Sequence, residues 1–215
     1  MDAVFNRWPQ VIVQFEDFES SKAVALLERY RHTYRMFNDD IQGTGSVTLS
    51  GLMSAVRNAG LELKDARVLC AGAGSAGLGV CDQIVQGMEE CGLSRKQAME
   101  QFVVCTSKGT LGAADGTHGD PNYKRHLEDY QRSWINPTVS DGMSIADAVL
   151  KFKPNVLLGL STKANVFDEQ VVRNMAAVND RPIIMPMSNP TSKCECTPED
   201  AYKWTNGRAI VRALS

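Results

Sequence analysis

The chain has 215 residues, of which 43% are hydrophobic and 22% are charged, and its formal net charge is −2. This length and composition predict one globular domain with a full core, and the near-zero charge gives no basis for binding nucleic acid or an anionic membrane. Because no window approaches about eighteen uninterrupted apolar residues, a membrane-spanning helix is excluded.

Predicted strands and helices alternate along the first half of the chain. Short β-branched or apolar runs predict strands, and apolar residues spaced by three and four predict helices. The strands are expected at residues 11–15, 67–71 and 102–105, and the helices at 19–30, 44–58, 80–90 and 94–100. Ser94 is expected to be the N-cap of the last of these helices.

The second half of the chain begins with a stretch rich in glycine, aspartate and asparagine. Residues 108–140 predict a surface excursion with one helix near residues 123–132. Beyond it, helices are expected at 144–151, at 168–177 and after Thr197, and strands at 156–160 and 182–187. Strands that alternate with helices predict an α/β fold of Rossmann type, a doubly wound, mainly parallel sheet with helices on both faces.

A glycine-rich loop, GAGSAGLG, lies between a predicted strand and a predicted helix. Gly72, Gly74 and Gly77 have the spacing of dinucleotide-binding loops, for a tight turn, for close approach of a pyrophosphate and for packing of helix on strand. The N-terminus of the helix that follows offers unpaired N–H groups to phosphates, and Ser75 and Ala76 of the loop are expected to bind the cofactor. The loop therefore predicts a dinucleotide site; the alternative is a glycine-rich turn that binds nothing.

The end of the next predicted strand favours NADP over NAD. In NAD sites an acid at this position binds the adenosine ribose and repels a 2′-phosphate. This chain has Thr106 there, followed by Ser107, which can donate to a phosphate, and Lys108, which adds a charge. Lys124 and Arg125 could fold back over the same place. The alternative is that Ser107 and Lys108 are ordinary surface residues, because some NAD enzymes of this fold also lack the acid.

The six cysteines predict reduced thiols. Cys70 and Cys105 lie in apolar strand-like runs, where a reduced cysteine acts as a small core residue. Cys194 and Cys196 lack the nearby histidine or second cysteine pair that a tetrahedral zinc site needs.

The opening MDAVFNRWPQ lacks the basic start and apolar centre of a signal peptide. We therefore expect an intracellular protein, cytoplasmic or mitochondrial.

Two pairs of adjacent carboxylates precede the glycine-rich loop: Glu16 with Asp17, and Asp39 with Asp40. The first pair and one member of the second could supply three oxygens to a magnesium or manganese ion and leave positions open for substrate. Because neighbours in a regular strand point to opposite faces, Glu16 and Asp17 can share an ion only if the predicted strand ends or twists there. The alternative is a set of helix caps and solvated loop carboxylates.

Four motifs, in this order along the chain, resemble the malic enzymes: QFEDF, YRMFNDDIQGT, GAGSAGLG and PMSNPTSKCECTPEDAYKWTNGRAI. The resemblance extends over nearly the whole chain. It implies an enzyme that oxidatively decarboxylates malate to pyruvate and carbon dioxide, reduces a nicotinamide dinucleotide and uses manganese or magnesium. It also implies that the full-length protein is a homo-oligomer.

The resemblance assigns the metal ligands of the family to Glu16, Asp17 and Asp40. The ion would chelate malate through a carboxylate oxygen and the C2 oxygen and polarise the growing ketone. Asp39 matches a carboxylate that the family places beside its catalytic lysine, where it supports the protonation state of that lysine.

Two more residues receive roles from the resemblance. Thr44 matches a contact to the cofactor phosphate at a helix start. Asn189 matches an amide that contacts malate near the nicotinamide, and the alternative is a turn asparagine before Pro190.

Two functional groups of the family have no match in this sequence. Malic enzymes use a lysine as general base and a tyrosine as general acid, both upstream of the first acidic pair, and only fifteen residues precede Glu16. The last residues, VRALS, also depart from the family's continuation. We therefore expect residues 1–215 to be a single dinucleotide-binding domain of a malic enzyme, with the preceding catalytic domain absent, and this polypeptide alone to be inactive.

Other classes of function stay open as alternatives. The chain could be a cofactor-binding module without catalysis of its own, or it could belong to an NAD-dependent malic enzyme. An amino-acid or folate dehydrogenase would share the Rossmann domain but needs no carboxylate-bound metal, so the acidic pairs count against it. An interaction protein would leave both the acidic pairs and the glycine loop without a role.

Overall fold

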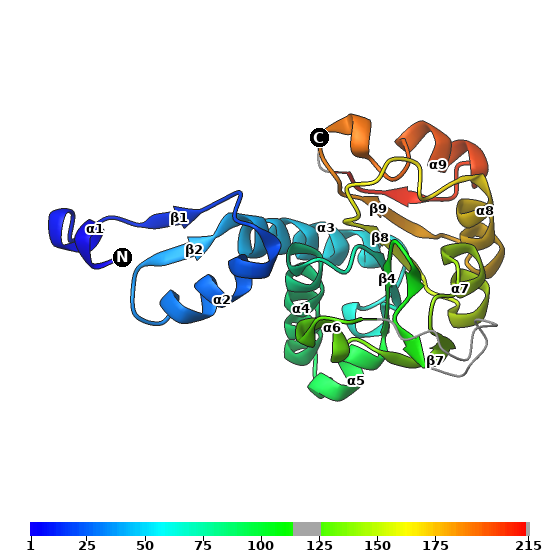
Figure 1. Cartoon of the computed structure of the whole chain (residues 1–215). Coiled ribbons are helices and arrows are strands. Elements are labelled where there is room, and N and C mark those ends of the chain that lie inside the picture. Colours follow the sequence, from blue (N-terminus) through cyan, green and yellow to red (C-terminus); the bar gives the residue numbers. More distant parts are fainter. Residues whose placement is uncertain (114–125, 214–215) are drawn as a thin grey trace.

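A six-stranded sheet forms the centre of the molecule in the computed structural model, which describes residues 1–113 and 126–213 (Figure 1). The strand order is β10-β9-β8-β3-β4-β5, and every pair is parallel except β4 with β5. The strands are β3 (Val68–Ala71), β4 (Phe102–Thr106), β5 (Gly109–Thr110), β8 (Val156–Gly159), β9 (Ile183–Pro186) and β10 (Ile210–Val211). The predicted mainly parallel Rossmann-type sheet is confirmed.

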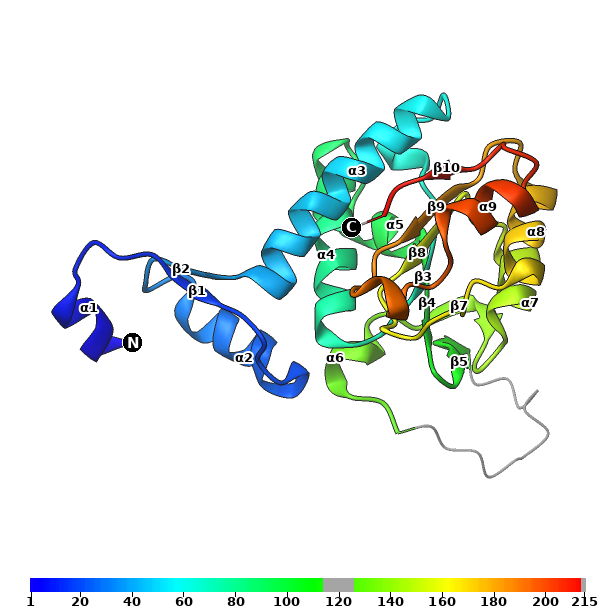
Figure 2. The same cartoon turned by 90° about the horizontal axis from the view of Figure 1, so that it is seen from above.

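Helices cover both faces of this sheet (Figures 1 and 2). One face carries α3 (Thr44–Asn58), α4 (Ser75–Glu90) and α5 (Arg95–Glu100), and the other carries α7 (Ile145–Phe152), α8 (Glu169–Val178) and α9 (Pro198–Trp204). Alternate strand residues serve the two cores: Val68 and Cys70 face the first, and Leu69 and Ala71 face the second. No helix in the described ranges has the length and apolar character needed to cross a membrane.

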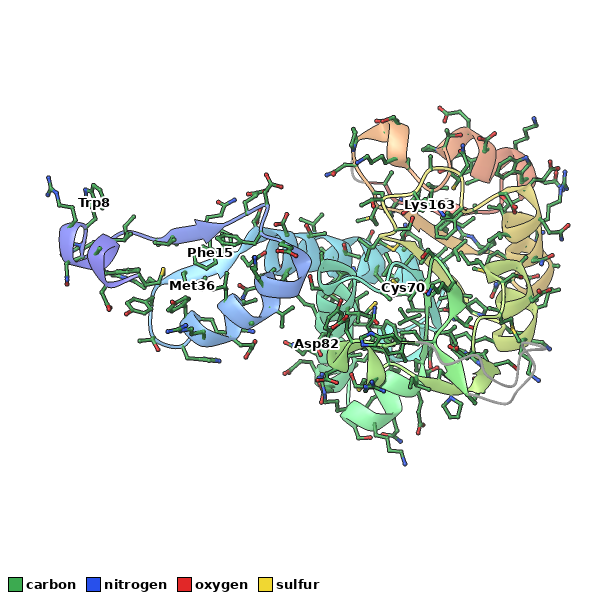
Figure 3. The ribbon with its side chains drawn as sticks, in the orientation of Figure 1. Trp8, Phe15, Met36, Cys70, Asp82 and Lys163 are labelled. Atoms are coloured by element: carbon green, nitrogen blue, oxygen red, sulfur yellow. The ribbon has the colours of Figure 1, made fainter. Side chains whose placement is uncertain are left out.

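Residues 1–38 form a separate unit, which we call the N-terminal arm, and it projects away from the sheet (Figures 1 and 2). It contains α1 (Asp2–Arg7), β1 (Val13–Phe15), α2 (Ser20–Tyr30) and β2 (Met36–Asn38), and its two strands pair in parallel. Figure 3 shows Trp8, Phe15 and Met36 on the arm, well apart from Cys70 in the central sheet. A π-helical turn, η1 (Asp39–Gly43), joins the arm to α3.

Most predicted elements lie where the sequence places them, with two informative differences. Helix α4 begins at Ser75 with Gly74 as its N-cap, five residues before the predicted start, because the second half of the glycine loop is already helical. The pattern also gives no indication of α1, of β2 or of β10, in which Val211 of the final VRALS pairs with Ile184. Ser94 is confirmed as an N-cap, since its side chain accepts the backbone N–H of Gln97, and Thr197 caps α9 in the same way by accepting the N–H of Asp200.

The stretch predicted as a surface excursion is described only at its two ends, because residues 114–125 lie outside the described residues. The described ends hold β6 (Gly112–Ala113), α6 (Asp129–Arg132) and β7 (Asn136–Ser140), and β6 pairs with β7. Leu111, Trp134 and Val139 are buried there. These ends are therefore anchored on the sheet domain. A short 3₁₀ turn, η2 (Leu63–Asp65), precedes β3.

Candidate functional site

The carboxyl ends of β3 and β8 mark the place where the fold can bind a ligand. These strands are neighbours, but β3 leads into α4 on one face and β8 leads towards α8 on the other. Such a reversal of connection direction opens a crevice at the strand ends. A cavity of about 620 Å³ lies there, lined by the glycine loop, the end of β4 and the connection that follows β8. We call it the first cavity.

The glycine loop has the geometry that its three glycines predict. Gly72 has φ +135°, and a Cβ added there would overlap the carbonyl group of Leu160. A Cβ at Gly77 would overlap the carbonyl oxygen of Gly72, so these two positions let helix and strands pack closely. At Gly74 an added Cβ would meet no atom within 4 Å, so the loop backbone faces open space at this point.

The first turn of α4 lies between two cavities and contributes to the lining of both. The N–H groups of Ser75, Ala76 and Gly77 have no acceptor within the helix, because the first residues of any helix lack one. Ala76 and Gly77 line both the first cavity and a second one of about 440 Å³, and Ser75 lines the second. The side-chain amide of Gln131 donates to the carbonyl oxygen of Ala73 at 2.9 Å and helps to fix the loop.

Thr106 and Ser107 line the first cavity at the end of β4. They belong to the tight turn between β4 and β5, in which Gly109 has φ +89° and the Thr106 hydroxyl accepts the N–H of Lys108 at 3.0 Å. Lys108 is on this turn but is not among the residues that line the cavity. Lys124 and Arg125 lie outside the described residues.

The second cavity brings together several residues singled out from the sequence. Asp17, Asp40, Thr44 and Asn189 all line it, next to the start of α4. The N–H of Asp17 donates to Oδ2 of Asp40 at 2.8 Å. Strand β1 ends at Phe15, and Asp17 has φ +58°, so the strand alternation is broken at the acidic pair. The strand therefore ends before the acidic pair, and of the four predicted carboxylates Asp17 and Asp40 are the two that line this cavity.

Glu16 and Asp39 are placed differently. Glu16 does not line the second cavity, and its Oε2 accepts from the side-chain amide of Gln14 at 2.5 Å. Asp39 is also absent from the lining, and its carboxylate lies against Gly43 one turn later. Within the described part of the chain, no three His, Cys, Asp or Glu side chains form a metal-binding group. The carboxylate oxygens of Asp17 and Asp40 are hard donors of the kind that magnesium and manganese prefer. Two such ligands would leave several coordination positions of the ion open.

The connection after β8 contributes residues that the sequence analysis misses. Leu160 and Thr162 line both cavities, and Ser161 and Lys163 line the first. Lys163, labelled in Figure 3, has no ion-pair partner among the described residues. The only sequence signal is that a predicted strand ends at this point. Strand order, which places β8 beside β3, is needed to see its importance.

Comparisons with known proteins agree with this geometry. The family described as "Malic enzyme, NAD binding domain" matches residues 41–215. An NAD-dependent malic enzyme of Photorhabdus laumondii is 44% identical over 98% of this chain and 37% of its own length. An NADP-dependent malic enzyme of Dictyostelium discoideum is 42% identical over 99% of this chain and 38% of its own length. The chain thus spans less than two-fifths of the length of these relatives.

Solved structures give the same picture of the fold. A crystal structure of Entamoeba histolytica malic enzyme has a TM-score of 0.70 and 25% identity, and it covers 99% of this chain and 41% of that one. A crystal structure of NAD-dependent malic enzyme from Thermotoga maritima has a TM-score of 0.73 at 22% identity, covering 99% of this chain and 50% of that one. At 22% identity, the similarity to the Thermotoga maritima structure supports the fold alone.

Proposed function

This chain belongs to the malic enzyme family, and we propose that it supplies the dinucleotide-binding part of a metal-dependent enzyme that converts malate to pyruvate and carbon dioxide while reducing NADP. The observation that carries the proposal is the junction of two cavities. The first contains a complete dinucleotide-binding loop, and the second contains Asp17, Asp40 and Asn189. They share Ala76, Gly77, Leu160 and Thr162 as a common wall.

The residues of the first cavity fit a dinucleotide. In the proposal the pyrophosphate lies over Gly74, where an added Cβ would meet open space, and receives N–H groups from Ser75 and Ala76. Thr106 and Ser107 lie along the cavity at the end of β4, where the adenosine ribose is expected. Gly72 and Gly77 serve the packing that shapes the loop.

The residues of the second cavity fit a hydroxy acid and a divalent cation. When bound, the dinucleotide supplies a hydride acceptor and the cation supplies a Lewis acid for the substrate oxygens. Asp17 and Asp40 would hold the cation through carboxylate oxygens, and Glu16, which lies outside the cavity lining, would be the third ligand once its carboxylate turned away from Gln14. Asn189 would bind malate and Thr44 the cofactor phosphate, and Asp39 would stand beside the catalytic lysine of the complete protein.

The choice of NADP rests on the end of β4. With Thr106 in place of an acid, nothing on that strand end repels a 2′-phosphate, and Ser107 lines the cavity as a donor. A hydrogen bond to a charged group is worth about 1.5–3 kcal/mol, so one such contact favours NADP by roughly ten- to a hundredfold. The second candidate is an NAD-dependent enzyme, which the name of the 44% identical Photorhabdus relative favours.

The ratio of the two dissociation constants tests this choice. We expect the wild-type chain to bind NADPH more tightly than NADH, and Thr106→Asp to shift the ratio towards NADH by roughly tenfold or more. Thr138→Asp is the matched control, since Thr138 is exposed and lines neither cavity. Tighter binding of NADH by the wild type would reject the NADP proposal, and an unchanged ratio in Thr106→Asp would reject its mechanism.

We also propose that this polypeptide by itself binds the cofactor but does not turn over malate. The general base and general acid of the family have no match here, and each such group is typically worth about 10²–10⁴-fold in rate. An assay of the 215-residue chain with malate, NADP and manganese is expected to give no activity above the no-enzyme control. Robust turnover would show that catalytic groups lie elsewhere in this sequence.

Two properties of the full-length protein complete the proposal. It is a homo-oligomer, and it works in a reducing intracellular compartment, either cytoplasmic or mitochondrial. The free state of all six cysteines supports the reducing compartment. Size-exclusion chromatography with light scattering on the full-length protein checks the first property.

A further inference from the structure

One carboxylate near the site is completely buried. Glu195 lies between the 3₁₀ turn η3 (Thr191–Lys193) and α9, and it is 0% exposed. It accepts the N–H and the hydroxyl of Ser161 at 2.8 and 2.7 Å, and the N–H and the hydroxyl of Ser188 at 3.3 and 2.6 Å. Ser161 follows β8 and Ser188 follows β9. A single side chain therefore joins the connections that leave two neighbouring strands.

The two serine hydroxyls extend the reach of this carboxylate. Ser188 Oγ accepts the N–H of Thr162 at 2.9 Å, and Ser161 Oγ accepts the N–H of Lys163 at 3.1 Å. Each hydroxyl donates its proton to Oε1 of Glu195 and keeps a lone pair that accepts a backbone N–H. The N–H groups of three consecutive residues, 161–163, are thus tied to Glu195 directly or through one hydroxyl.

The backbone around this carboxylate is shaped to fit it. A Cβ added at Gly159 would lie 2.5 Å from the carboxyl group of Glu195, so only glycine leaves room for the side chain. Thr162 has φ +54°, a left-handed conformation that β-branched residues rarely adopt. A conformation of this kind persists only where surrounding contacts hold it. Thr162 donates its N–H to Ser188 Oγ at 2.9 Å and its hydroxyl to the carbonyl oxygen of Ser161 at 2.7 Å, and both serines are in turn hydrogen-bonded to Glu195.

This network stands directly behind the wall that the two cavities share. Leu160 and Thr162 line both cavities, and Ser188 and Asn189 line the second. We propose that Glu195 is a positioning residue, which fixes the loop 160–163 and the Ser188–Asn189 segment in the shape that binds the dinucleotide. Glu195 lines neither cavity and acts through the two serines. The inference rests on the proposed dinucleotide site.

The test replaces Glu195 by glutamine, which keeps the size of the side chain but puts an NH₂ donor against groups that already donate. Glu199→Gln is the matched control, because Glu199 is exposed and lines neither cavity. Two quantities are measured on folded protein: hydrogen exchange at the amides of residues 161–163, and the dissociation constants for NADPH and NADH. Circular dichroism confirms that each variant is folded at the temperature used.

We expect Glu195→Gln to speed exchange at residues 161–163 and to raise the dissociation constants by roughly tenfold, the equivalent of one lost hydrogen bond to a charged group. Glu199→Gln should change neither quantity. Wild-type exchange and affinity in Glu195→Gln would overturn the proposal. A lowered melting temperature with unchanged affinity would also overturn it, because that result describes a merely structural residue.

Two serine variants keep the inference falsifiable if Glu195→Gln fails to fold. Ser188→Ala should speed hydrogen exchange mainly at the amide of Thr162, and Ser161→Ala mainly at that of Lys163. Each variant removes the hydroxyl that links this amide to Glu195. Uniform or absent effects in both variants would overturn the network. If the wild type binds neither dinucleotide, the proposed function fails, whereas the exchange measurements still decide whether Glu195 holds the loop.

Discussion

The sheet domain and the N-terminal arm differ in how firmly packing fixes them. Strands β3, β8 and β9 are buried throughout, with Val68, Leu157 and Ile184 fully inaccessible. Among the described side chains of the arm, only Ala23, Leu27, Met36 and Asn38 are buried, while Trp8, Ile12 and Phe18 are 57%, 68% and 40% exposed. The first cavity is built entirely by the sheet domain, and the second takes Asp17 from the arm.

This difference predicts two kinds of binding. A site with rigid, complete walls binds its small molecule without further ordering of the protein. A site that needs a metal-coordinating residue from a loosely packed segment must order that segment before the cation binds. Dinucleotide binding should therefore be a property of the sheet domain, and cation binding should depend on the position of the arm. The predictions below try to break or sharpen this contrast.

The largest effect should come from Gly72→Ala. With φ +135° and the Leu160 carbonyl in the path of a Cβ, this change should cost about 2–4 kcal/mol of unfolding free energy. Gly74→Ala is the control, because open space surrounds its Cβ position; it should cost less than about 1 kcal/mol yet weaken NADPH binding. Urea denaturation and fluorescence titration separate the two outcomes. Equal stability losses in both variants would contradict the different roles assigned to these glycines.

Asp40→Asn should produce the next largest effect, confined to the cation. Removal of one charged ligand is expected to weaken manganese binding in the complete enzyme by at least the roughly 10–100-fold that typically follows loss of a residue supporting a metal ligand. The stability of the sheet domain should change by less than about 0.5 kcal/mol. Electron paramagnetic resonance of bound manganese measures the affinity, with the exposed Asp180→Asn as control. Unchanged manganese affinity in Asp40→Asn would remove Asp40 from the site.

Local and long-range features of the site differ in how far the sequence predicts them. The glycine loop and the N-caps depend on neighbours within a few residues, so Gly72, Gly77 and Ser94 are recognised from spacing alone. Ser161 and Glu195 are not recognised from the sequence. Their roles depend on strand order and on hydrogen bonds between residues that lie 34 positions apart in the chain. Glu195 also stands in the polar stretch SKCECTPED, where a buried acid has no pattern that marks it.

Lys163→Gln should have a smaller effect that depends on salt. Lys163 lines the first cavity on the connection after β8, so its charge can attract a dinucleotide phosphate. Because Lys163 is exposed, its loss should raise the dissociation constant for NADPH only about three- to tenfold at low ionic strength, and less in high salt. Lys151→Gln is the control, since Lys151 lines neither cavity. An effect independent of salt would argue against a phosphate contact.

The smallest effect concerns alkaline pH. Burial, assisted by the nearby Cys194, Glu195 and Asp200, raises the pKa of the Cys196 thiol from 9.0 to about 12. The folded state therefore keeps a proton that the unfolded state loses, so stability is intact below the unfolded pKa and falls as pH rises towards the folded one. We expect the free energy of unfolding to fall by about 1 kcal/mol by about pH 9.5, and Cys196→Ala to remove most of this dependence on pH. The same slope in wild type and variant would exclude this contribution.

A calorimetric titration of the chain with NADPH and NADH, with and without manganese, tests the contrast between the two regions most directly. If the sheet domain carries a complete dinucleotide site, saturable binding with one site per chain appears in metal-free buffer containing a chelator, and manganese changes the affinity less than about threefold, or about 0.7 kcal/mol. Absence of saturable binding by either dinucleotide, or binding that requires manganese, would contradict a self-sufficient dinucleotide site.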